Sequence, residues 1–340
     1  MSVTDLNVVA RALVAPGKGI LAADESSPTI KKRFDSISAE STEGSRRSYR
    51  EMLFTTPDAC RHISGVILFD ETLRQSTRDG TPFPDYLSSQ GMIPGIKVDK
   101  GAKALPNFMG EKVTEGLDGL NDRLAEYRDL GAKFAKWRAV IDIGDGIPTD
   151  FCILANAHAL ARYAALCQEA GLVPIVEPEV LMDGDHDIVL CEEVTNTVLS
   201  VTFDQLKLHR VNFEGMLLKP NMVISGKKCP VQAGTEEIAE ATVRCLTANV
   251  PEEVPGIVFL SGGQSDVDAT AHLSAMNKLG SHPWELSFSY GRALQASALQ
   301  SWAGQKENYE LGQAAFGLRA KLNGLARTGS YNPSMESSTT

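Results

Sequence analysis

The stretch Glu214-Gly-Met-Leu-Leu-Lys219-Pro220-Asn-Met-Val223 joins a short apolar run to a single lysine. Residues 216–218 predict a buried strand, and Pro220 ends it directly after Lys219. A lysine at the mouth of an apolar site loses hydration, which disfavours its charged form and lowers its pKa. The neutral amine is a nucleophile that forms a Schiff base with a ketone or aldehyde. Taken alone, a lysine at a strand end more often only extends to water, so the rest of the chain must decide.

Further apolar runs, each bounded by Gly, Pro or Asp, predict a series of strands with helix-like segments between them. Besides the run at Lys219, the expected strands are 19–24, 65–70, 95–99, 131–138, 173–179, 256–261 and 286–290. The clearest helical periodicity covers 155–170 and 236–248. Eight βα repeats need about 250 residues, and this chain has 340. We therefore predict an α/β fold, a single-domain (β/α)8 TIM barrel spanning 1–327, followed by a flexible Ser/Thr-rich tail at 328–340.

Charged side chains gather toward the carboxyl ends of the expected strands. Residues i and i+2 of a strand share a face, and three expected strands carry such pairs: Lys97 and Asp99, Lys136 and Arg138, Glu177 and Glu179. Asp24 and Lys219 follow two other strands at the same level. Charges inside a barrel are costly unless paired, and TIM barrels hold their chemistry at this end. A doubly wound sheet would do the same, but its G-x-G-x-x-G is missing after the first strand and no P-loop occurs.

Two groups of residues are suited to binding phosphate. The seventh strand runs into Ser261-Gly262-Gly263-Gln264-Ser265 and the eighth into Tyr290-Gly291-Arg292. Glycine-containing loops at these positions expose backbone N–H groups, which is the usual phosphate site of this fold, and Arg292 adds a charged fork. A second anion site is expected near the first strand, from the following residues: Ser26, Arg33, Lys97 and Arg138.

Composition excludes several classes of function. The formal net charge of −10 argues against bulk nucleic-acid binding. None of the six cysteines forms a C-x-x-C pair, so reduced thiols in a cytoplasmic protein are expected rather than zinc or disulfides. Residues 1–13 resemble neither a signal peptide nor a membrane span. The histidines lack metal-ligand spacing, and the acidic turn 183–187 lacks the EF-hand pattern. We expect no catalytic metal and no cofactor.

Seven motifs occur in the order found in one enzyme family: GILAADES (19–26), GIKVDKG (95–101), KWR (136–138), VPIVEPE with DGDHD (173–187), LLKPNMV (217–223), FLSGGQS (259–265) and FSYGRALQASAL (288–299). The chain closely resembles class I fructose-1,6-bisphosphate aldolase over about residues 16–327. This resemblance implies a (β/α)8 barrel, usually a homotetramer, that acts on a sugar bisphosphate and triose phosphates in glycolysis and gluconeogenesis. Neither a nucleic-acid nor a membrane partner is implied.

The resemblance also implies roles for individual residues. Lys219 would form the Schiff base, Glu177 would be the general acid/base and Lys136 would assist proton transfer. Asp24 would work at the C4 hydroxyl, and Glu179 would support the lysine electrostatically. Phosphate contacts at one end would come from Ser261, Gly262, Gly291 and Arg292, and at the other from Ser26, Arg33, Arg46 and Lys97. Ser289 would also touch substrate.

One departure from the family concerns the C-terminus. The animal and plant relatives end in a longer tail that finishes with a tyrosine, whereas this chain ends Ser337-Ser338-Thr339-Thr340 and its last tyrosine is Tyr331. The role of that tail in proton exchange is therefore not expected to carry over.

Two other functions remain open at this point. Another Schiff-base barrel, such as a transaldolase or a deoxyribose-phosphate aldolase, would share the lysine, but two separate phosphate clusters favour a bisphosphate. A non-catalytic barrel scaffold would not require the full set of Asp24, Lys136, Glu177 and Lys219.

Overall fold

Eight parallel strands close into a barrel in the computed structural model, which describes residues 3–337. The strands, in their order around the barrel, are β1 (Gly19–Ala23), β2 (Ile63–Leu68), β3 (Ile93–Lys97), β6 (Phe134–Ile141), β7 (Val173–Val180), β8 (Leu217–Leu218), β9 (Gly256–Phe259) and β10 (Glu285–Tyr290). Pairing of β1 with both β2 and β10 closes the ring. The predicted (β/α)8 barrel is confirmed, and each expected strand overlaps an observed one.

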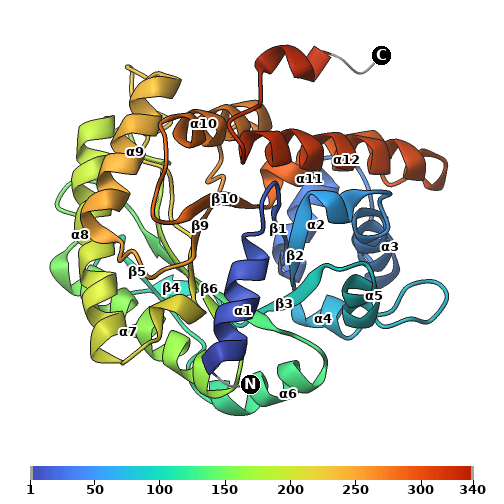
Figure 1. The fold of residues 1–340 in the computed structure, drawn as a ribbon, viewed down its shortest axis with the longest axis horizontal. Coiled ribbons are helices and arrows are strands. Elements are labelled where there is room, and N and C mark those ends of the chain that lie inside the picture. Colours follow the sequence, from blue (N-terminus) through green and yellow to red (C-terminus); the bar gives the residue numbers. More distant parts are fainter. Residues whose placement is uncertain (1–2, 338–340) are drawn as a thin grey trace.

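Helices surround the barrel on its outside (Figure 1). They are α2 (Ser27–Asp35), α3 (Glu43–Phe54), α4 (Asp70–Leu73), α5 (Phe83–Ser89), α6 (Leu120–Asp129), α7 (Asp150–Glu169), α8 (Ile188–Leu208), α9 (Thr235–Asn249), α10 (Asp266–Lys278), α11 (Arg292–Trp302) and α12 (Tyr309–Ala326). The helices predicted at 155–170 and 236–248 correspond to α7 and α9. Thr149, Asp187 and Ser265 begin α7, α8 and α10 by accepting a hydrogen bond from a backbone N–H of the first turn.

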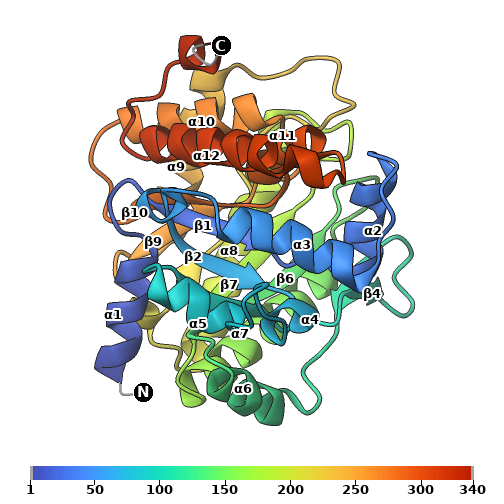
Figure 2. The same cartoon turned by 90° about the vertical axis from the view of Figure 1, so that its right-hand side faces the viewer.

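Helix α1 (Val3–Leu13) lies across the end of the barrel where the strands begin (Figure 2). Its Leu6, Ala10 and Leu13 are buried in one cluster with inward-facing strand residues. The strand members of that cluster are Ile20, Ala22, Ile67, Phe134, Val173, Ile175, Leu217 and Val258. This apolar layer fills the lower lumen, so the charged side chains of the same strands lie above it at the carboxyl end. Sequence analysis did not anticipate this role for the N-terminal segment.

Outward-facing strand residues pack against the helices. Trp137 is fully buried and stacks on Tyr163 of α7, with ring centroids 5.6 Å apart. Because side chains alternate along β6, this outward placement of Trp137 turns Lys136 and Arg138 inward, as the spacing predicted. Gly95 of β3 leaves the room that the Phe134 ring occupies, since a Cβ there would collide with the ring.

An antiparallel hairpin that the sequence did not reveal follows β3. It consists of β4 (Ala102–Ala104) and β5 (Lys112–Thr114). Asn156 of α7 donates to the Lys112 carbonyl at 2.8 Å, and the Thr114 hydroxyl donates to the Arg138 carbonyl at 2.8 Å. The hairpin therefore braces β6 beside the residues that face the lumen.

The segment after α12 packs against the outside of the barrel as far as it is described. Tyr331 is 2% exposed, and its hydroxyl donates to Glu336 at 2.8 Å. Glu336 also accepts from the buried guanidinium of Arg319 in α12 at 2.5 Å. Residues 338–340 of the expected tail lie outside the described residues, and the division into a barrel and a flexible tail stays a prediction.

Of the helices within residues 3–337, none is sufficiently long and apolar to span a membrane.

Candidate active site

A cavity of about 550 Å³ opens at the carboxyl ends of the strands. Its size suits a small-molecule ligand. Most of the residues that the sequence singled out line it: Asp24, Ser26, Arg33, Lys97, Lys136, Arg138, Glu177, Glu179, Lys219, Ser261, Gly262, Ser289, Gly291 and Arg292. The barrel thus brings together side chains from seven of its strands and from the segments that follow them.

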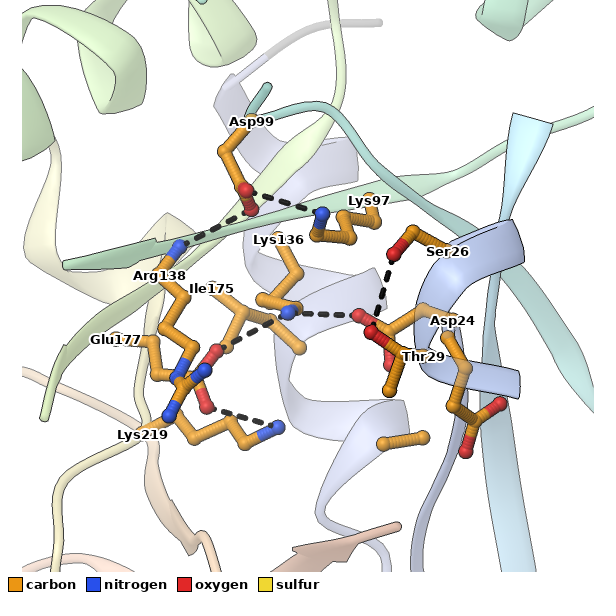
Figure 3. A network of polar contacts seen from close by, with 12 residues as sticks. Asp24, Ser26, Thr29, Lys97, Asp99, Lys136, Arg138, Ile175, Glu177 and Lys219 are labelled. Carbon is orange, nitrogen blue, oxygen red and sulfur yellow. Dashed lines mark hydrogen bonds and ion pairs between the residues drawn. The ribbon is translucent and has the colours of Figure 1, made fainter. Parts of the chain in front are cut away.

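A buried network of charges occupies the centre of this cavity (Figure 3). The Nζ of Lys136 lies 2.7 Å from Oδ2 of Asp24 and 3.2 Å from Oε2 of Glu177. The other oxygen of Glu177, Oε1, lies 3.2 Å from Nζ of Lys219. The side chains of Lys136, Glu177 and Lys219 are at most 5% exposed. Glu177 therefore stands between two amines, and all three side chains have little contact with solvent.

Strand geometry places each member of the network. Asp24 directly follows β1, Lys136 and Glu177 face inward from the adjacent strands β6 and β7, and Lys219 directly follows β8. The backbone N–H of Lys219 donates to the carbonyl of Val176 at 2.8 Å, which continues the pairing of β8 with β7. The backbone of the lysine is thereby fixed although β8 is only two residues long.

The pKa values of Lys136 and Asp24 are shifted in opposite directions. Burial by itself would lower the pKa of Lys136, but the carboxylates of Asp24 and Glu177 outweigh it and raise that pKa above its usual range. Burial would raise the pKa of Asp24, but the ammonium groups of Lys136 and Lys219 outweigh it and hold that pKa well below the ordinary value. Lys136 is therefore a permanent cation, and Asp24 is a permanent anion near neutral pH.

The two glutamates of β7 differ although they share a face. Burial would raise the pKa of Glu177, but Lys136 and Lys219 outweigh it and lower that pKa. Burial raises the pKa of Glu179, and its ion pair with Arg138 offsets this only in part. The direct ionic partner of Glu179 is Arg138, so any support that Glu179 gives to Lys219 acts at longer range.

One anion cradle is built by the segments after β9 and β10. Gly262 and Gly263 have φ values of +63° and +126°, conformations that L side chains rarely adopt. Arg292, at the start of α11, donates to the Gly262 carbonyl at 3.3 Å. The hydroxyl of Ser289 is buried and has no hydrogen-bond partner within residues 3–337. Free backbone N–H groups at a helix start, a guanidinium and an available hydroxyl suit a phosphate.

A second polar cluster faces the first from β1, α2 and β3. The hydroxyls of Ser26 and Thr29 lie 3.1 Å apart, and Nζ of Lys97 lies 3.1 Å from Oδ1 of Asp99. Thr29 lines the cavity but was missed by sequence analysis. Its spacing of three from Ser26 in the first turn of a helix was the available signal.

Glu25 is a further residue that sequence analysis missed. It is buried and ion-pairs with Arg33, a cavity residue, and with Arg50 at 2.8 Å. It also accepts from the side-chain amide of Gln295 at 2.9 Å. Burial would raise the pKa of Glu25, but the two arginines outweigh it and lower that pKa. Glu25 thus holds Arg33 at the edge of the cavity.

Two of the predicted phosphate ligands do not line the cavity. Arg46 of α3 forms a forked pair with Glu71, with donor–acceptor distances of 2.8 and 2.5 Å, so its guanidinium is already occupied. Gly263 follows Gly262 in the same turn but is not among the residues that line the cavity. The family resemblance suggested Arg46 and the glycine-containing turn suggested Gly263, but neither signal reveals the tertiary contacts of a residue.

The part of the chain that the structure describes contains no group of three or more His, Cys, Asp and Glu side chains placed to hold a metal ion. The expectation of a metal-independent reaction stays a prediction.

The structure is a (β/α)8 barrel in which paired amines and carboxylates lie beside two anion-binding clusters. These features together define the class of protein as a barrel enzyme for phosphorylated small molecules. Comparison with known proteins narrows this class. The family model described as "Fructose-bisphosphate aldolase class-I" matches residues 5–340. The chain therefore belongs to the class I fructose-bisphosphate aldolase family, and its activity is that of a lyase of the aldolase type.

Named relatives agree with this family. A "Probable fructose-bisphosphate aldolase class 1" of Xanthomonas campestris pv. campestris is 60% identical over 97% of this chain and 99% of its own length. "Fructose-bisphosphate aldolase 6, cytosolic" of Arabidopsis thaliana is 56% identical over 93% of this chain and 88% of its own. The structure of fructose-bisphosphate aldolase from Plasmodium falciparum in complex with TRAP and a small-molecule inhibitor superposes with a TM-score of 0.96 at 51% identity, covering 97% of this chain and 95% of that one.

The charge network makes the free energy of unfolding depend on pH. Folding lowers the pKa values of Asp24 and Glu177, so each carboxylate contributes stability above its unfolded pKa of roughly 4. That contribution is lost as the pH falls through the folded pKa. We expect Asp24→Asn to be less stable than the wild type at pH 7, with the difference shrinking as the pH drops below about 4. Urea unfolding at several pH values measures the difference in the free energy of unfolding between the two proteins. A difference that does not change with pH would contradict this prediction.

Proposed function

We propose that the chain reversibly cleaves D-fructose 1,6-bisphosphate to dihydroxyacetone phosphate and D-glyceraldehyde 3-phosphate through a Schiff base on Lys219. The contrast between the two buried amines carries this proposal. Lys136 contacts two carboxylates and is held in its charged form, so it cannot be the nucleophile. Lys219 contacts one carboxylate, Glu177, within residues 3–337. Glu177 can take a proton from the Lys219 ammonium and free its amine for attack.

The two anion-binding clusters set the orientation of the substrate. The carbon that Lys219 attacks is C2, and the C1 phosphate is carried by the carbon bonded directly to C2. That phosphate must bind beside β8, and β9 is the neighbouring strand, followed by β10. The cradle at Gly262 and Arg292 therefore takes the C1 phosphate. The cluster at Ser26 and Lys97, on the side of β1 and β3, takes the C6 phosphate.

The first chemical step forms the iminium. The Lys219 amine adds to the C2 ketone, and the resulting carbinolamine loses its oxygen as water after receiving a proton from Glu177. The C=N⁺ bond that remains is an electron sink beside the C3–C4 bond. The carboxylate of Glu177 and the more distant one of Glu179 offset its positive charge. Because the iminium supplies the sink, the proposal requires neither a metal nor an organic cofactor.

The second step breaks the C3–C4 bond. Asp24 accepts the hydrogen bond of the C4 hydroxyl and takes its proton, the C4 oxygen becomes the carbonyl of the aldehyde, and the bonding electrons move to the iminium nitrogen. A carboxylate with a low pKa is a weak base. This step therefore needs the contact between Asp24 and Lys136 to loosen when the hydroxyl enters between them. Lys136 then stabilises the charge that develops on the C4 oxygen.

The last steps release the second product. Glyceraldehyde 3-phosphate leaves, and an enamine of dihydroxyacetone phosphate stays on Lys219. C3 takes a proton, which regenerates the iminium, and water then adds at C2 and expels the lysine amine. The proton that Asp24 took from the C4 hydroxyl passes to Glu177 through Lys136, which contacts both carboxylates. Glu177, which also contacts Lys219, gives this proton to C3 and then serves as acceptor and donor during the hydrolysis.

The setting of the enzyme follows from its family. We place it in glycolysis and gluconeogenesis in the cytoplasm, supported by the relatives that are named cytosolic. A homotetramer is proposed as well. Apolar side chains at the beginnings of the adjacent helices α7 and α8 are exposed and suit a subunit interface: Phe151, Leu154, Val189 and Leu190.

The covalent residue can be identified directly. Borohydride added with dihydroxyacetone phosphate should reduce the Schiff base and add the mass of the reduced triose to the peptide that contains Lys219. The variant Lys219→Met should remain unlabelled and inactive. Mass spectrometry of the digested protein reads the outcome, and a label on Lys136 or Lys97 would overturn the assignment.

The acid/base role belongs to one of the two glutamates on β7. We expect Glu177→Gln to lower kcat by roughly 10²–10⁴, the usual range for a positioned acid/base. Its KM should change far less, because the phosphates supply most of the binding. Glu179→Gln is the matched variant, and its kcat should fall less because its carboxylate pairs with Arg138. Steady-state kinetics would reassign the role if the two effects were reversed.

The C-terminal segment is expected to be dispensable for the chemistry. None of residues 328–337 lines the cavity, and Glu336 is held on the outside of the barrel by Arg319. Deleting residues 334–340 should leave cleavage within about threefold of the full-length chain. Tritium exchange from labelled dihydroxyacetone phosphate should be equally insensitive. A loss of exchange of about a hundredfold, roughly 2.7 kcal/mol in barrier terms, would show that the segment handles the proton after all.

A further inference from the structure

Lys227 lies in the segment that follows β8 and Lys219. Its Nζ contacts Oδ1 of Asp183 at 2.7 Å, and Asp183 follows β7. The two segments are also joined through their backbones. The backbone N–H of Lys227 donates to the carbonyl of Met182 at 2.7 Å, and the backbone N–H of Gly226 donates to the carbonyl of His186 at 2.8 Å. The backbone around Lys227 is therefore fixed, while its side chain remains 39% exposed and that of Asp183 60% exposed.

Lys227 and Arg292 approach the same point beside the phosphate cradle. A Cβ placed on Gly263 would lie 2.5 Å from Nζ of Lys227 and 3.1 Å from Nη2 of Arg292. Two cations therefore flank the space next to the turn that carries Gly262. Because both groups lie against Gly263, they are close enough to each other for one anion to accept hydrogen bonds from both.

The carboxylate of Asp183 interacts electrostatically with both cations, Lys227 and Arg292. Its hydrogen bond from Lys227, which outweighs the effect of partial burial, together with the charges of Arg292 and Arg138, lowers its pKa. A carboxylate is thus the present anionic partner of Lys227 at the rim of the cradle. An ion pair this exposed is weak, whereas a phosphate with two negative charges is the stronger partner for an ammonium group.

We propose that Lys227 is an additional cationic ligand of the phosphate held by Gly262 and Arg292, and that it leaves Asp183 for this phosphate when substrate binds. The inference rests on the proposed function, because it adds a binding residue to the same site. It predicts that Lys227 acts on the triose that carries the C1 phosphate and not on the other.

The condensation reaction separates the two phosphates, because dihydroxyacetone phosphate brings one and glyceraldehyde 3-phosphate brings the other. Lys227→Met should raise the KM for dihydroxyacetone phosphate about tenfold, as expected for a lost charge-assisted hydrogen bond. The KM for glyceraldehyde 3-phosphate and kcat should stay near their wild-type values. Lys228→Met, at the exposed neighbouring lysine, is the control and should leave both KM values unchanged.

The variant Asp183→Asn tests whether Lys227 binds the phosphate or only stabilises the two loops through its ion pair with Asp183. If Asp183 competes with the phosphate for Lys227, this variant should lower the KM for dihydroxyacetone phosphate, opposite to the effect of Lys227→Met. If the ion pair only braces the loops, both variants should raise that KM together and lower the midpoint of thermal unfolding. That second outcome would overturn the proposal.

Binding of inorganic phosphate tests the same residue without any turnover. In isothermal titration calorimetry, Lys227→Met should bind inorganic phosphate several-fold more weakly than the wild type and Lys228→Met, and Asp183→Asn should bind it more tightly. Equal affinities in all four proteins would refute the role of Lys227. An inactive wild type that cannot be labelled at Lys219 would instead refute the proposed function, so the two failures are distinguishable.

Discussion

The contact of one carboxylate, Glu177, with two amines is the interaction on which the site depends. Taking Lys136, Glu177 and Lys219 out of water costs several kcal/mol per ion unless the partners are held at good distances. The observed separations of 2.7–3.2 Å provide that compensation. The arrangement also makes the two lysines different, because only Lys136 has a second carboxylate, Asp24, at close range. The electrostatics that stabilise the buried charges thus also hold Lys136 in its charged form.

The barrel must be rigid for this contact to persist. Strands β6 and β7 are each eight residues long and pair over their whole length, from Phe134 opposite Val173 to Ile141 opposite Val180. Below the charges, the side chain of Phe134 and the residues of α1 fill the lumen with apolar contacts. Close packing of this layer resists collapse of the charged layer above it. The apolar face of helix α1 at one end of the barrel therefore supports the chemistry at the other.

The two anion-binding clusters rely on another principle, which is preorganisation: their donors are held in place by neighbouring groups before a ligand binds. Glu25 is a buried residue of the cavity wall and holds Arg33 in place, while the backbone of the turn at Gly262 supplies donors without side chains. Arg292 begins α11, so its position is tied to a helix start. Donors that are fixed before the ligand arrives lose little entropy on binding. The C-terminal ion pair of Arg319 with Glu336 lies outside this system.

The amino-acid sequence by itself determined the strands, the face on which each charge lies and the end of the barrel that carries chemistry. These features follow from local rules: the alternation along a strand turns Lys136 inward and Trp137 outward, and Pro220 stops a strand directly after Lys219. Only the tertiary structure decided which charges meet. Arg46 pairs with Glu71 across 25 positions, Lys227 with Asp183 across 44 and Lys136 with Asp24 across 112. Such partners depend on the register and closure of the whole barrel, which no local pattern encodes.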